Sequence, residues 1–329
     1  MRLAEALLQN PIASSSRLVS HRRVAELKNE FSWSHSRETT FRRCPRQYFF
    51  TYYGSWGGWD KRSDAKTRTL YVLKQLVRRP AWSGQVVHKC INWVLDTLRK
   101  TGSPPPEEDA LRNTLRRMNK DFQESGEGLY WEDPKSFCAL YDHEYEEDVT
   151  DEQWENTMQR AATCVSAFYA SPHMESFAKD STSNWLALEQ LASFNVDSTK
   201  AYLQPDFARR TPEGIEIYDW KTGKANAPAT KEQLAVYALY ASSFWKLPAE
   251  EVTTIEFNLS TGETISAQTT KENTAAALES IRTSIASMKS LLDDPATNRA
   301  SEEKFALTDD DAICRTCNFK RVCPKFLSR

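Results

Sequence analysis

The amino-acid sequence predicts an α/β fold in which a helical region precedes a central mixed sheet flanked by helices. Two patterns support this prediction. From about residue 61 to 172 apolar side chains recur at helical spacing, whereas from residue 184 onward short β-like runs alternate with helices. With 329 residues, 40% of them hydrophobic and 27% charged, the chain can bury one large core or two modest ones.

The helical region contains three apolar stripes in which side chains repeat every three or four residues. Their members are Leu70, Leu73, Leu76 and Val77; then Val87, Ile91, Val94, Leu95 and Leu98; then Trp154, Met158, Ala161, Val165 and Phe168. The Gly- and Pro-rich stretch 101–106 is typical of a break between helices.

The β-rich region begins near residue 184. Strands are predicted at 185–194, 202–209, 214–220 and 252–259, with a short partner at 263–268 after a Thr-Gly turn. Helices are predicted at about 230–245 and from about Lys271 to Leu292. The expected order is therefore helices, then strands around one helix, then a long helix.

The sequence contains no membrane or secretion signal that we recognise. No apolar run approaches the roughly 18 residues of a spanning helix, and the N-terminus lacks an apolar signal core. We therefore expect a soluble, intracellular protein of the cytoplasm or nucleoid. Several Arg and Ser in residues 1–27 leave organelle targeting open, although Glu5 and Glu26 favour an ordinary N-terminal helix.

The formal net charge of −2 hides a strong asymmetry along the chain. Residues 37–79 carry eleven Lys or Arg against three acids, whereas residues 121–156 carry thirteen acids against one Lys. A basic segment supplies the attraction for phosphates on which nucleic-acid binding rests. Ten aromatic residues also lie between Phe31 and Trp59, interleaved with Arg. This aromatic-basic segment can stack bases or pack into a core, and we expect most of its rings to pack.

Seven cysteines, an odd number, argue against a disulfide framework in an intracellular chain. Three of them, Cys90, Cys138 and Cys164, stand alone in apolar or mixed segments and are interpreted as small buried hydrophobes. The other four belong to two sequence motifs at opposite ends of the chain. These are Cys44-Pro45-Arg46-Gln47-Tyr48 and a C-terminal trio, Cys314, Cys317 and Cys323, followed by Pro324.

Two acids and a lysine lie on neighbouring predicted strands. Asp206 follows Pro205, and after twelve intervening residues comes Asp219-Trp220-Lys221. Residues two apart in a strand share a face, so Lys221 lies beside Asp219. Carboxylates bind Mg²⁺ or Mn²⁺, and an ammonium group can orient a nucleophile, which suits phosphodiester hydrolysis. A surface hairpin with an ion pair is the alternative interpretation.

Two predicted helices carry polar pairs spaced by one turn. Gln233 and Tyr237 share a face of the helix after the strands, and Gly84 and His88 share a face of an earlier helix. Each pair can also be explained without a function, by an ordinary amphipathic helix or a structural histidine. Glu189, in the first predicted strand, suits either a site acid or a strand-edge ion pair, and we leave it open.

Taken together, these elements resemble the PD-(D/E)XK nucleases, in the RecB-like branch with an iron–sulfur cluster that includes AddB, CRISPR-associated and exonuclease-V-like nucleases. The resemblance implies a restriction-endonuclease-like core and a [4Fe–4S] cluster that joins the chain ends, bound by Cys44, Cys314, Cys317 and Cys323. Structural zinc is the alternative for these thiolates. The resemblance also implies that His88, Asp206, Asp219 and the Trp220 carbonyl bind Mg²⁺ or Mn²⁺. The implied catalytic residues are Asp206, Asp219, Lys221, His88, Gln233 and Tyr237.

We therefore expect a DNA nuclease that acts on single strands or ends, leaves 5′-phosphates and serves repair, recombination or defence. A DNA-end-binding subunit that does not cleave, or one that needs a helicase partner, is the alternative, and RNA is not excluded as substrate. We expect four segments: an N-terminal segment (1–60) with the first cluster cysteine, a helical region (61–180), the nuclease core (181–295) and a Cys-rich segment (296–329).

Overall fold

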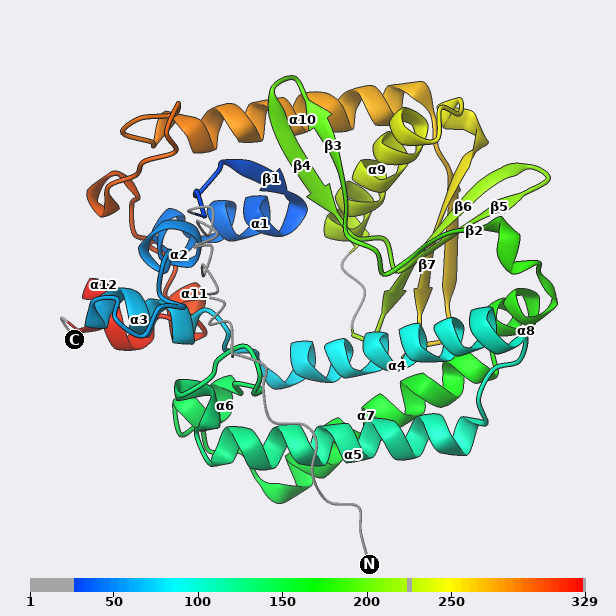
Figure 1. Cartoon of the computed structure of the whole chain (residues 1–329), viewed down its shortest axis with the longest axis horizontal. Coiled ribbons are helices and arrows are strands. Elements are labelled where there is room, and N and C mark those ends of the chain that lie inside the picture. Colours follow the sequence, from blue (N-terminus) through cyan, green and yellow to red (C-terminus); the bar gives the residue numbers. More distant parts are fainter. Residues whose placement is uncertain (1–26, 224–226, 328–329) are drawn as a thin grey trace, which may run out of the picture.

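The computed structural model describes residues 27–223 and 227–327 (Figure 1). The strands are β1 (Ser32–Ser34), β2 (Trp185–Leu188), β3 (Ala192–Val196), β4 (Thr199–Leu203), β5 (Phe207–Thr211), β6 (Gly214–Lys221), β7 (Val252–Asn258) and β8 (Thr264–Gln268). The helices are α1 (His35–Arg43), α2 (Pro45–Phe49), α3 (Ala65–Leu73), α4 (Arg79–Thr101), α5 (Glu107–Gly126), α6 (Tyr141–Glu144), α7 (Asp151–Tyr169), α8 (Pro172–Lys179), α9 (Ala227–Phe244), α10 (Lys271–Ser290), α11 (Asp311–Arg315) and α12 (Pro324–Leu327). The predicted N-terminal helix lies outside the described residues.

A mixed five-stranded sheet is the centre of the fold, as predicted, with the strand order β2-β5-β6-β7-β8. β6 and β7 are parallel, whereas the other neighbouring pairs are antiparallel. Parallel neighbours need a long crossover connection, and α9 provides it. This crossover places α9 against one face of β6, so residues of α9 reach the side chains that this strand presents on that face.

A smaller sheet, with the order β1-β4-β3, was not predicted. It arises because two predicted strands are each divided between the two sheets. The 185–194 run splits into β2 and β3 after Glu189, which has a φ of 44°. The 202–209 run splits into β4 and β5 around Pro205. The chain therefore changes sheets twice, and both changes lie beside the acids discussed below.

Helices cover both faces of the five-stranded sheet. α4, α5 and α7 pack together (Figure 1). Side chains of α4, α7 and α8 form one core with Trp220 and Phe257 of the strands. On the other face, α9 packs against Ile215 and Ile217 of β6. The predicted break between helices is confirmed at Gly102, whose φ of 79° ends α4. The mixed α/β architecture predicted from the sequence is therefore confirmed.

The first and last described segments of the chain lie side by side (Figure 1, blue and red). The Arg46 amide donates to the Ala306 carbonyl at 3.0 Å, and its guanidinium pairs with Glu302 at 2.9 Å. The rings of Tyr48 and Phe49 pack against Phe305. In the part of the chain that the structure describes, no helix is long and apolar enough to cross a membrane.

Candidate active site

His88 is positioned by the middle of α4, where this helix crosses the end of β6. One turn earlier, a Cβ built on Gly84 would lie 2.9 Å from Thr222 Oγ1. Glycine therefore allows α4 to approach the residue that directly follows Lys221. This close approach brings the His88 ring to the sheet.

Asp206 lies in the short connection between β4 and β5, and both of its carboxylate oxygens are held. Oδ1 lies 3.0 Å from His88 Nδ1, and Oδ2 accepts a hydrogen bond of 2.6 Å from the Trp220 amide. The carboxylate thus joins α4 to β6. The Trp220 side chain itself lies on the opposite face of the sheet, in the core with Phe168 and Phe177.

Glu189, which the sequence left open, lies at the same place. Its amide donates to the Asp206 carbonyl at 3.0 Å, and its carboxylate Oε1 lies 4.0 Å from His88 Nδ1. Ligand atoms of His88, Glu189 and Asp206 all lie within 4.8 Å of one another, the only such group of three or more among the described residues. The one signal in the sequence was an acid within the first predicted strand, and it also fits an ordinary strand-edge ion pair.

Asp219 and Lys221 share the face of β6 that α9 covers. Lys221 Nζ lies 2.5 Å from Asp219 Oδ2 and donates to Gln233 Oε1 at 3.1 Å. Gln233 Nε2 lies 2.6 Å from the Tyr237 hydroxyl, which donates to the Gln204 carbonyl at 3.1 Å. The ammonium group is therefore fixed between a strand carboxylate and a helix amide.

The crowded carboxylates make the local potential negative. Burial and the charge of Asp206 together raise the pKa of Asp219 to about 6, against the opposing effect of Lys221. Burial and Asp206 likewise raise the pKa of Glu189. Burial lowers the pKa of His88, but the attraction of Asp206, Asp219 and Glu189 outweighs it and raises the pKa to about 9. Such a site favours a bound cation.

The hard oxygen donors, together with one imidazole, suit Mg²⁺ or Mn²⁺. A family model of the PD-(D/E)XK nuclease superfamily matches residues 32–324. The chain belongs to this superfamily. No curated protein matches it. For this superfamily member, the geometry brings His88, Asp206, Asp219, Lys221, Gln233 and Tyr237 together at one end of the sheet, with Glu189 beside them.

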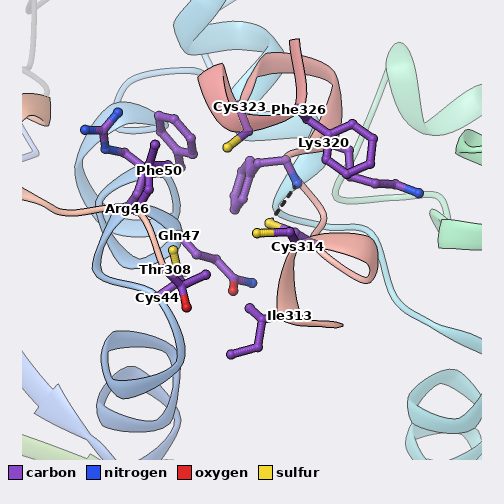
Figure 2. A pocket seen from close by; sticks show the side chains of 13 residues that line it. Cys44, Arg46, Gln47, Phe50, Thr308, Ile313, Cys314, Lys320, Cys323 and Phe326 are labelled. Carbon is purple, nitrogen blue, oxygen red and sulfur yellow. Dashed lines mark hydrogen bonds between the residues drawn. The ribbon is translucent and has the colours of Figure 1, made fainter. Parts of the chain in front are cut away.

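The four cysteines of the two terminal motifs line one pocket of this superfamily member. Cys44 comes from the start of α2, and Cys314, Cys317 and Cys323 come from the region of α11 and α12. In Figure 2 the labelled sulfurs of Cys44, Cys314 and Cys323 are directed toward a shared space. None of the described cysteines forms a disulfide.

The surroundings of these cysteines are mainly apolar. Phe50 and Phe319 are both 1% exposed and line the pocket. The Phe319 amide donates to Cys317 Sγ at 3.5 Å. Burial, together with the neighbouring Cys44 and Cys323, raises the pKa of Cys317 to about 12. A bound metal is the ordinary way to keep such thiolates charged.

The aromatic-basic segment mostly packs inside the protein. Tyr48, Phe49 and Phe50 are buried, whereas Trp56 and Trp59 are 39% and 41% exposed and contact each other edge to face. Its arginines bond within the chain: Arg42 to Glu38 and Glu232, Arg43 to Thr316, and Arg46 to Glu302.

Proposed function

We propose that this protein is a metal-dependent deoxyribonuclease that hydrolyses phosphodiester bonds of single-stranded DNA or DNA ends. The observation that carries the proposal is the juxtaposition of three carboxylates and His88 with a lysine held by Gln233. A binding subunit that does not cleave would not need this lysine beside Asp219. Superfamily membership supports the reaction class.

In this proposal His88, Glu189, Asp206 and Asp219, with the Trp220 carbonyl, hold Mg²⁺ or Mn²⁺. A cation bound there would neutralise phosphate charge and acidify a water molecule. Lys221, positioned by Asp219 and Gln233, orients the attacking water and stabilises the developing charge on the phosphate. Tyr237 keeps the Gln233 amide in the orientation that presents its oxygen to Lys221.

We also propose that Cys44, Cys314, Cys317 and Cys323 bind a [4Fe–4S] cluster, as in the RecB-like iron–sulfur branch. One distant cysteine with a compact trio, in contrast to the two similarly spaced pairs usual for zinc, supports this assignment. The cluster would be structural, closing a chain loop of about 270 residues.

The test of the enzymatic proposal uses purified protein with end-labelled single-stranded DNA, duplex DNA and RNA. We expect cleavage of single-stranded DNA in Mg²⁺ or Mn²⁺, with 5′-phosphate products, and none with excess chelator. DNA binding without cleavage in either metal would instead support the partner-dependent subunit. Undiminished cleavage by Asp219→Asn would show that the activity arises elsewhere.

A further inference from the structure

A second pocket, of about 700 Å³, lies between β7, β8, α9 and α10. Its walls are mostly small or aliphatic, including Leu234 and Ala235 of α9, Ile265 of β8, and Ala276 and Ala277 of α10. The size and the apolar lining are typical of pockets that take organic ligands. Nothing in the catalytic arrangement described above uses this space.

Glu256 gives this pocket a polar group without a partner. The residue lies on β7, is 5% exposed and lines the pocket. Among the described residues its carboxylate has neither a hydrogen bond nor an ion pair, unlike the nearby Glu38, which pairs with Arg42 at 2.6 Å. A ligand in the pocket can therefore supply hydrogen-bond donors to this carboxylate.

The pocket adjoins the candidate active site. Glu256 is the register partner of Asp219 on the parallel neighbouring strand, so both residues belong to the same face of the sheet. Lys231 and Glu232, which line the pocket, directly precede Gln233 on α9. His35, also in the lining, feels the charge of Lys221: burial lowers its pKa most, Glu232 opposes this effect, and Lys221 lowers the pKa further.

The charges of the lining select against phosphate. Three acids, Glu38, Glu232 and Glu256, line the pocket with one lysine, Lys231, and Arg42 pairs with Glu38 and Glu232, so the local charge stays negative. A DNA strand can therefore place a neutral base here while its backbone stays at the metal site. The unpartnered Glu256 carboxylate in this cavity matches a flat ring that has N–H donors on its edge. Guanine has two adjacent donors on its Watson–Crick edge, whereas the one N–H of thymine lies between two carbonyl acceptors.

We propose that this pocket binds the nucleobase next to the scissile phosphate, with the Glu256 carboxylate accepting hydrogen bonds from it and therefore favouring guanine over thymine. This inference rests on the proposed nuclease function. It makes the protein selective at one position near the cut, although the remainder of the strand is bound through its backbone.

The test uses single-stranded oligonucleotides that carry one guanine or one thymine at successive positions. We expect the wild-type protein to cleave about tenfold faster when guanine occupies one position beside the cut. Glu256→Gln, which replaces one acceptor oxygen by a donor, should reduce this preference to less than about twofold. Equal cleavage of all guanine and thymine substrates by the wild-type protein overturns the proposal.

Two matched variants on α10 test the pocket itself. Ala276→Trp fills the pocket, whereas Ala275→Trp adds the same side chain on the exposed surface outside it. We expect slower cleavage and weaker binding of guanine substrates only in Ala276→Trp. Binding is measured by fluorescence anisotropy with Ca²⁺, so this readout remains if the protein does not cleave DNA. If the pocket instead binds a basic peptide, the two variants should have the same cleavage rate and the same affinity for guanine substrates. That result overturns the proposal.

Discussion

The two candidate metal centres of this protein differ in nearly every physical respect. The first centre, formed by His88, Glu189 and Asp206, offers imidazole and oxygen donors at the end of a sheet. The second, the cysteine pocket, offers sulfur donors among buried rings. The first gathers residues from the middle of the chain, and the second joins its two ends. In the function proposed above, this difference means that the first centre presents charge to a substrate and the second holds the two chain ends together.

The largest expected effect is a loss of cleavage rate without a loss of folding stability. Asp219→Asn or Lys221→Ala should lower the rate of DNA cleavage about 1000-fold, because each removes a charge aimed at the phosphate or the metal. Circular dichroism and the thermal unfolding midpoint should stay close to wild type. A variant that unfolds instead would mean that this ion pair stabilises the fold more than it serves the reaction.

The cysteine pocket should show the opposite behaviour. Cys317→Ser should lower the unfolding midpoint by about 10 °C and remove bound iron, because the closed loop between the chain ends is released. The control is Cys138→Ser, which changes a half-buried cysteine outside the pocket. Thermal melts, visible absorbance and iron analysis measure the effect. Zinc in place of iron, with the same loss of stability, would correct the identity of the metal but keep its structural role.

A smaller effect is expected where α4 meets β6. Gly84→Ala should slow cleavage about tenfold, because the new methyl group contacts Thr222 Oγ1 and shifts His88 away from Asp206. The double variant Gly84→Ala/Thr222→Ala removes the contacting oxygen and should recover most of the activity. If the double variant is as slow as the single one, the contact with Thr222 is not the reason for glycine.

The smallest effect is expected from Tyr237→Phe. Loss of the hydroxyl removes one hydrogen bond to Gln233 and one to the Gln204 carbonyl, with a cost of about 1 kcal/mol and a rate reduction of roughly fivefold. Gln233→Ala, which also frees Lys221, should reduce the rate more. Single-turnover cleavage measures both variants, and equal rates in the two would place the tyrosine, not the glutamine, next to the reaction.

Local patterns predicted much of this arrangement. Alternation along β6 placed Asp219 and Lys221 on one face, and helical spacing paired Gln233 with Tyr237. Glu189 could not be assigned in the same way. In the sequence, β3 and β4 of the smaller sheet separate Glu189 from Asp206, which lies beside it in space. An acid at the end of a strand also has no periodic signature. The split of two predicted strands between two sheets was hidden for the same reason, since an extended run looks alike in either sheet.

By itself the sequence determined the order of the elements, the faces of β6 and α9, and the residue types that suit a divalent cation and a sulfur-bound metal. Only the tertiary structure decided that Glu189 joins His88 and Asp206, that the cysteines of both ends line one pocket, and that Glu256 lies unpartnered beside the site. The physical reason is the separation along the chain. Strand and helix periodicity relates residues only a few positions apart, whereas these groupings depend on how elements distant in the sequence pack together.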